Sequence, residues 1–241
     1  MNTEPDTKIL AKSAEASYSQ SRVPTPDYVR QDHLSSADIS VYKHKTNPHT
    51  IISHRGTDVG SNSIAKQLQA DFNIAIGNKS ADKLHNERTK KTEDIMRRIK
   101  QDNPDHSIHL ASHSLGGSSQ QQAMIKSQYV RDNAKSSDTF NAGSSLLGGK
   151  GLSAKNPAYA DIAKKQTNHS VYGDAISENV DNSMIGKVKR YDNKRDKSIG
   201  QQVLKFAQPY LQKSLLGRTV SLLGKGALGT QSSHSLRNFT K

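Results

Sequence analysis

Short apolar runs alternate with apolar residues spaced three or four apart along the middle of the chain. The short runs predict strands, and they fall at residues 38–42, 50–53, 108–113, 139–143, 169–174 and 187–191. The wider spacings predict helices at residues 64–76, 86–101, 118–124 and 156–165. Strands that alternate with helices are typical of an α/β fold with a mostly parallel sheet.

The two ends of the chain differ from this alternating middle. Residues 1–36 are polar, with one short helix predicted at 9–16, and we expect this segment to pack on or flank a single domain at 37–241. Residues 199–228 are apolar at every third or fourth position, with lysine and arginine interspersed. This segment is either a helix packed on the sheet or an interfacial element whose leucines enter lipid while its basic residues meet head groups.

The chain is basic and polar, with 35 Lys and Arg against 22 Asp and Glu, a net charge of +13 and only 32% hydrophobic residues. Such an excess favours anionic partners, either phospholipid surfaces or nucleic acid, although it also serves solubility alone. Aromatic residues make up 5% of the chain. Because base stacking needs aromatic side chains, nucleic acid is an unlikely partner.

Several classes of protein are not expected. The chain has no cysteine, so it forms no disulfide and no thiolate metal site. Its histidines show no metal-ligand spacing, and the glycines at 148–151 lack the spacing of a phosphate loop, so we expect no metal and no cofactor. The polar N-terminus and the lack of a long apolar stretch predict neither a signal peptide nor a transmembrane segment, hence an intracellular (cytoplasmic) or virus- or effector-associated protein. The oligomeric state stays open.

One turn carries the candidate chemistry. The apolar run at 108–111 leads into Ser112-His113-Ser114-Leu115-Gly116-Gly117 and then into a helix-compatible stretch. A serine on a sharp strand-to-helix turn has its hydroxyl pushed out of the backbone, and the helix N-terminus that follows stabilises an oxyanion. Ser114 is therefore a candidate nucleophile, although an ordinary turn serine gives the same local pattern.

A serine nucleophile needs a histidine to take its proton and a carboxylate to hold that histidine. On a fold of this kind both follow the serine in the order acid, then histidine. Asp174 comes directly after a predicted strand, and His234 lies in a loop-like stretch near the C-terminus. The alternatives for these two roles are Asp161, Asp181 and His169.

Five separated segments together resemble the class 3 lipase family, the α/β-hydrolases that include fungal triacylglycerol lipases and plant phospholipases A1. They are Ala14–Tyr18, Arg55-Gly56-Thr57, Ser112–Gly117, Gly173-Asp174 and His234–Phe239. The resemblance spans roughly residues 10 to 240. It implies an α/β-hydrolase-like fold with a mostly parallel central sheet flanked by helices.

The resemblance also implies roles for single residues. Ser114 would be the nucleophile, His234 the general base and then acid, and Asp174 the orienting carboxylate. Thr57 and Leu115 would supply backbone N–H groups to the oxyanion hole. His113 would pack beneath the turn rather than act as the base.

The chain departs from the family pattern at two places that bear on function. Ser112 stands where glycine is usual, and the lid-like region at about 60–92 is unusually polar. A lid that opens at an oil surface needs an apolar face, so the polar region favours phospholipids or small esters over bulk triglyceride. The sequence thus predicts a phospholipase- or esterase-like serine hydrolase, with an inactive scaffold that binds anionic membranes or other polyanions as the alternative.

Overall fold

The computed structural model describes residues 4–19, 21–56, 79–142, 157–172, 184–192 and 236–240, with backbone only at 79–82 and 237–238. A seven-stranded sheet runs through this part of the chain in the order β1-β2-β3-β4-β5-β6-β7. The strands are β1 (Tyr28–Arg30), β2 (Ile39–His44), β3 (His49–His54), β4 (Ser107–His113), β5 (Ala134–Phe140), β6 (Gln166–Val171) and β7 (Lys187–Tyr191). β1 to β3 pair antiparallel, whereas β3 to β7 pair parallel.

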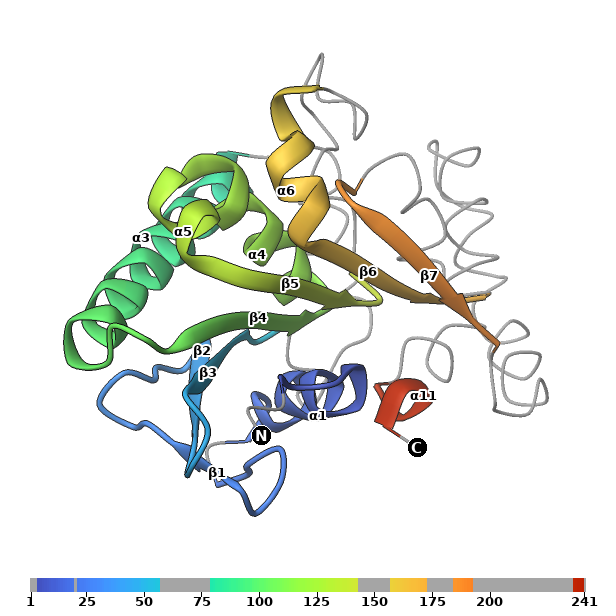
Figure 1. Cartoon of the computed structure of the whole chain (residues 1–241). Helices are drawn as coiled ribbons and strands as arrows, with labels where there is room; N and C mark the ends of the chain where they lie inside the picture. The colour runs from blue at the N-terminus through green and yellow to red at the C-terminus, as the bar shows by residue number, and fades with distance from the viewer. Residues whose placement is uncertain are drawn as a thin grey trace, which may run out of the picture.

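Helices cover both faces of this sheet (Figure 1). On one face lie α3 (Lys79–Asp102), α4 (Leu115–Lys126), α5 (Gln128–Asn133) and α6 (Ala160–Lys165). On the other lie α1 (Thr7–Ala16) and α11 (Arg237–Thr240). A short 3-10 turn, η1 (Pro157–Tyr159), precedes α6. The predicted α/β fold class, with a mostly parallel central sheet flanked by helices, is confirmed.

Most predicted elements are present, and two strands differ in their bounds. The runs at 38–42 and 50–53 form the strands β2 and β3, which pair antiparallel, and β7 has the predicted bounds. β5 begins five residues before its predicted start, because three of its buried positions are filled by the polar residues Ser137, Asp138 and Thr139. β6 likewise begins at Gln166, three residues early. β1 was not predicted, since its three residues give no periodicity.

Residues before 37 form two described elements, α1, which packs on the sheet, and β1, which pairs with β2. Asp6 caps α1 by accepting the N–H of Ile9 at 2.8 Å, and Leu10, Ala11 and Ala14 are buried against the sheet. Two further predictions lie outside the described residues: the helix at 64–76 and the segment at 199–228. Of the lid-like region, residues 79–92 are part of α3, whereas 60–78 lie outside the described chain.

α4 is buried on nearly every side although half of its residues are polar. Two of its buried glutamines have partners on neighbouring segments: Gln120 Nε2 donates to Ser137 Oγ at 2.9 Å, and Gln121 Oε1 accepts the N–H of Ile185 at 2.8 Å. Buried polar groups stabilise a fold only when they are paired in this way. The helix that follows the candidate nucleophile is therefore held rigidly against β5 and the segment before β7.

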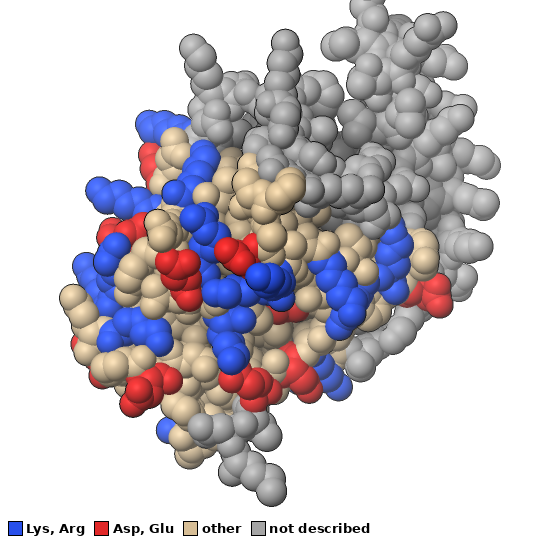
Figure 2. Space-filling model, turned by 45° about the horizontal axis from the view of Figure 1, so that its top comes forward, with Lys and Arg blue, Asp and Glu red and all other residues tan. Residues whose placement is uncertain are grey.

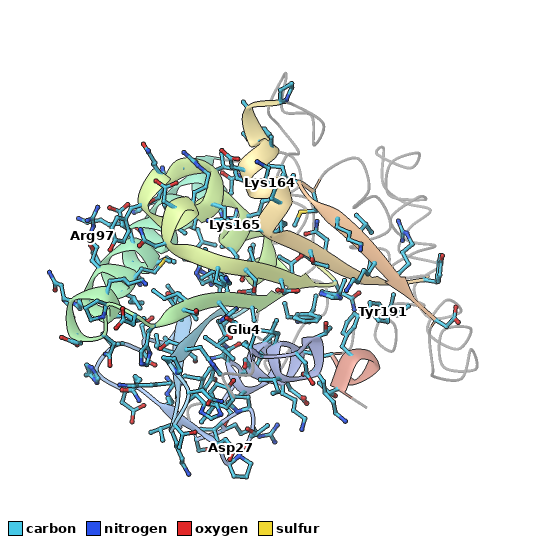
Figure 3. The ribbon with its side chains drawn as sticks, in the orientation of Figure 1. Glu4, Asp27, Arg97, Lys164, Lys165 and Tyr191 are labelled. Atoms are coloured by element: carbon cyan, nitrogen blue, oxygen red, sulfur yellow. The ribbon has the colours of Figure 1, made fainter. Side chains whose placement is uncertain are left out.

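Polar side chains also form a connected row on the α1 side of the sheet. His109 lies 2.6 Å from the Glu4 carboxylate and 3.0 Å from Ser136 Oγ, and Ser136 donates to Asp138. From Asp138 the row continues through His169 to Tyr191. Glu4 and Tyr191 mark its two ends in Figure 3.

Buried histidines make the protein sensitive to mild acid. Burial lowers the pKa of His49 to about 4 and that of His54 to about 3, and it also lowers the pKa of His109. Below about pH 6.5 these histidines are protonated in the unfolded chain, whereas their lowered pKa keeps them neutral in the folded protein. The free energy of unfolding is therefore expected to be highest above pH 6.5 and to fall as the pH drops toward 4, by about 1.4 kcal/mol per pH unit for each of His49 and His54. Urea unfolding at pH 7.5, 6.0 and 5.0 measures this loss.

A matched pair of variants assigns the loss to a single residue. In the wild type, the Tyr28 hydroxyl lies 2.7 Å from His49 Nε2, and a glutamine at position 49 keeps a polar partner for it. His49→Gln should therefore lower the number of protons taken up on unfolding between pH 7.5 and 5.0 by about one. His33→Gln, at an exposed histidine, should keep the wild-type dependence. Equal stability at pH 7.5 and 5.0 in the wild type would refute the argument.

Candidate active site

Ser114 lies between the end of β4 and the first residue of α4, with φ 55° and ψ −130°. Such a conformation costs a non-glycine residue on the order of 1–3 kcal/mol and persists only where the surroundings enforce it. Among the described residues, the only other non-glycine residue with positive φ is Asn141, directly after β5. Strained backbone is thus concentrated at the carboxyl ends of two adjacent strands.

The ordinary explanation for Ser114 is a helix cap, and the geometry does not fit it. Ser114 occupies the N-cap position of α4, and its carbonyl accepts the N–H groups of Gly117 and Ser118. Its side chain, however, makes no capping hydrogen bond. A capping serine uses its hydroxyl to accept an N–H of the first turn. The hydroxyl of Ser114 is therefore not used to hold the helix.

Two glycines allow the neighbouring segment to approach this serine. A methyl group at Gly116 would collide with the carbonyl oxygen of His54, and one at Gly56 would collide with the Tyr18 hydroxyl. The same group at Gly56 would lie 3.2 Å from Cβ of Ser114. Residues 54–56 therefore pass within contact distance of the serine turn.

Leu115 is one of the two predicted oxyanion-hole donors, and it is the first residue of α4. The first N–H groups of a helix have no acceptor within the helix, and the helix dipole adds partial positive charge there. The backbone at Leu115 therefore fits a negatively charged oxygen. The other predicted donor, Thr57, lies outside the described residues, one position after Gly56.

Residues 54–56 are held by contacts that the sequence did not reveal. The N–H of His54 donates to Ser112 Oγ at 2.8 Å, and the N–H of Arg55 donates to the carbonyl of Asp38 at 2.8 Å. Arg88 Nη1 donates to the carbonyl of Arg55 at 2.9 Å. Arg88 is itself buried, and its other terminal nitrogen lies 3.6 Å from Asp38.

The two remaining triad candidates, Asp174 and His234, lie outside the described residues, but the chain next to each one is described. β6 ends at Val171, at the same edge of the parallel sheet as Ser114, two strands or about 10 Å away. Leu236, two residues after His234, is buried in a cluster with Phe140 and Val171. Phe140 lies at the end of β5, and its carbonyl accepts the N–H of Ser114. The C-terminal turn that contains Leu236 therefore packs on the strand next to the serine.

The alternatives have other surroundings. His169 is buried between Asp138 Oδ1 at 2.9 Å and Tyr191 OH at 2.8 Å, on the α1 side of the sheet. Asp161 is exposed and pairs with Lys164 on α6. His113 Nδ1 lies 2.9 Å from Tyr18 OH, beneath the turn. Asp181 lies outside the described chain.

Metal ligands, long apolar helices and surface charge are the features of the described part of the chain that bear on other kinds of site. There, no group of three or more His, Cys, Asp or Glu residues is placed to hold a metal ion, and no helix is long and apolar enough to cross a membrane. Figure 2 shows Lys and Arg scattered over one face with Asp and Glu among them. That face carries mixed charge rather than a patch of one sign.

No protein family matches the chain, and no curated protein does. Among solved structures, it is similar to the Lip2 lipase from Yarrowia lipolytica, with 11% identity over 78% of this chain and 77% of that one and a TM-score of 0.49. It is also similar to a triacylglycerol lipase from Penicillium expansum, with 13% identity over 79% and 82% and a TM-score of 0.48. Both structures are named as lipases. A likeness of this degree assigns neither substrate nor activity to this chain.

Proposed function

We propose that the protein is a serine hydrolase that cleaves carboxylic esters of lipids through an acyl-enzyme on Ser114. The observation that carries the proposal is the Ser114 turn: a strained serine at the carboxyl end of a central strand, whose hydroxyl does not cap the helix that it begins. Strained backbone at a residue whose side chain does not stabilise the local structure is typical of a functional site. The family resemblance supplies the remaining partners.

The reaction follows from the proposed roles. Ser114 Oγ attacks the carbonyl carbon of the ester while His234 takes the hydroxyl proton and Asp174 holds the imidazole in the required tautomer. The resulting oxyanion accepts hydrogen bonds from the N–H groups of Leu115 and Thr57. His234 then returns the proton to the leaving alcohol, and an acyl ester remains on Ser114. Water, deprotonated by His234, releases the acid and restores the serine.

The substrate class in this proposal is polar lipid or small ester rather than bulk triglyceride. It rests on the polar composition of residues 60–92 and on the net charge of +13, which favours the anionic surface of phospholipid vesicles. A lid with few apolar residues buries little apolar surface at an oil interface, so it binds such an interface weakly. Contact with the membrane would be peripheral.

A substrate panel tests this class directly. The three substrates are a short p-nitrophenyl ester, vesicles that contain phosphatidylglycerol, and emulsified triolein, each assayed by product release. We expect the first two to be hydrolysed faster than the emulsion. A clear preference for triolein would refute the polar-lipid assignment while leaving the serine mechanism intact. No hydrolysis of any ester would refute the enzyme itself.

A further inference from the structure

We infer that Ser112 is a positioning residue for the oxyanion side of the active site, an inference that rests on the proposed function. Ser112 stands where the resembled family has glycine, so its side chain looks at first like a tolerated departure. In the structure, however, the Ser112 hydroxyl fixes the end of β3, the strand that leads to Gly56 and the serine turn.

The Ser112 hydroxyl is needed because the backbone pairing between β3 and β4 stops early. The last paired residues are Ile52 and Leu110. Beyond them the two strands no longer exchange backbone hydrogen bonds, yet His54 is still fully buried. Its N–H donates to Ser112 Oγ at 2.8 Å instead. The serine hydroxyl thus takes the place of the backbone acceptor that the ladder lacks.

Of the hydrogen bonds described above for residues 54–56, the Ser112 bond is the one that joins them to β4, the strand that leads to Ser114. Arg55 is held by the Asp38 carbonyl on one side and by Arg88 on the other, and both belong to elements other than β4. Gly56 packs closely against Ser114 and the His113 carbonyl. The Ser112 bond joins the end of β3 to β4 itself, two residues before Ser114.

Glycine at position 112 would remove that link. The buried N–H of His54 would lose its acceptor, and residues 54–56 could shift relative to Ser114. Since a misplacement of about 1 Å can cost on the order of 100-fold in rate, restoring the family residue should harm this enzyme. Ser112 does not touch the substrate, because its side chain is fully buried on the α3 side of β4.

The test compares Ser112→Gly and Ser112→Ala with the wild type in hydrolysis of a p-nitrophenyl ester. We expect kcat to fall about 10- to 100-fold with KM changed less than about threefold, because an oxyanion hole binds the transition state more tightly than the substrate. Affinity for an alkyl boronic acid, which forms a tetrahedral adduct on the serine, should fall in parallel. Ser112→Ala keeps Cβ, so it separates the loss of the hydroxyl from the extra flexibility of glycine.

Ser53→Ala is the matched control. Ser53 is a buried serine next to His54 on β3, and its hydroxyl has no hydrogen-bond partner in the described chain. This variant should keep the wild-type kcat and boronate affinity. A drop equal to that of the Ser112 variants would show that any lost buried hydroxyl has the same effect, and it would overturn the inference.

Two results separate this inference from the proposed function. If the wild type hydrolyses esters in a manner that depends on Ser114 while both Ser112 variants keep the wild-type kcat, the inference fails and the function stands. If the wild type hydrolyses nothing, the function fails. The bond itself is then read from amide hydrogen exchange, where the His54 N–H should exchange at least about tenfold faster in Ser112→Ala than in Ser53→Ala. Equal exchange rates would overturn the bond as well.

Discussion

Ser114→Ala is expected to lower kcat/KM for ester hydrolysis by at least about 10⁴-fold, because loss of a serine nucleophile removes the covalent route altogether. The folded structure should survive, since the hydroxyl makes no capping bond and α4 is held by its buried partners on β5. The measurement is hydrolysis of a p-nitrophenyl ester by wild type and variant of equal purity, with circular dichroism as the check on folding.

The control for this substitution is again Ser53→Ala, a buried serine changed in the same way outside the turn. It should retain the wild-type rate. A Ser114→Ala enzyme that keeps more than about a tenth of the activity would eliminate the serine mechanism, since residual rates after loss of the nucleophile lie far lower.

Asp174→Asn should produce the second large effect, a drop in kcat of about 10⁴-fold. An asparagine of the same shape presents a donor where the histidine N–H needs an acceptor, so it favours the wrong tautomer of the base. The loss should appear in kcat with little change in KM, because the role proposed for Asp174 is to orient the histidine and not to bind the substrate. Steady-state kinetics at pH 7 to 9 measures it.

Asp161→Asn is the matched control for the acid. Asp161 was an alternative for this role, and its side chain is 79% exposed and paired with Lys164. Its substitution should change the rate less than about twofold, as expected for an exposed ion pair. If Asp174→Asn keeps the wild-type rate, the acid is not Asp174, and Asp181→Asn becomes the next variant to measure.

The sequence predicted those elements whose pattern of apolar and small residues is contained in a short stretch of chain. β4, the Ser114 turn and α4 lie within twenty consecutive residues, and an apolar run followed by small residues predicts all three. The pairing of β2 with β3 likewise agrees with two apolar runs separated by Thr46-Asn47-Pro48, a sequence that favours a turn. These features need no knowledge of distant partners.

Buried polar residues account for the features that the sequence did not predict. The face of β5 toward α1 carries Ser136 and Asp138, whose partners lie on β4 and β6, so no hydrophobic pattern marks the strand. Ser112 and Arg88 were missed as supports of the site for the same reason: the acceptor of Arg88 is 33 residues away, and the donor to Ser112 is 58 residues away.

A usable signal did exist for Arg88. It lies seven residues before Ile95, which places the two residues on the same face of the predicted helix. A basic residue on an inward stripe indicates a buried partner, here the carbonyl of Arg55. For Ser112 no comparable signal exists, because a serine in place of glycine gives no indication of where its hydroxyl points.

Labelling with a fluorophosphonate tests the central claim most directly. The probe phosphonylates an activated serine, and mass spectrometry of the intact protein and its peptides locates the adduct. The account predicts one adduct per chain, at Ser114, and none in Ser114→Ala. No adduct on the wild type, or an adduct at another serine, would contradict it. Tight, strongly salt-dependent binding to anionic vesicles without any labelling would instead identify the chain as an inactive scaffold.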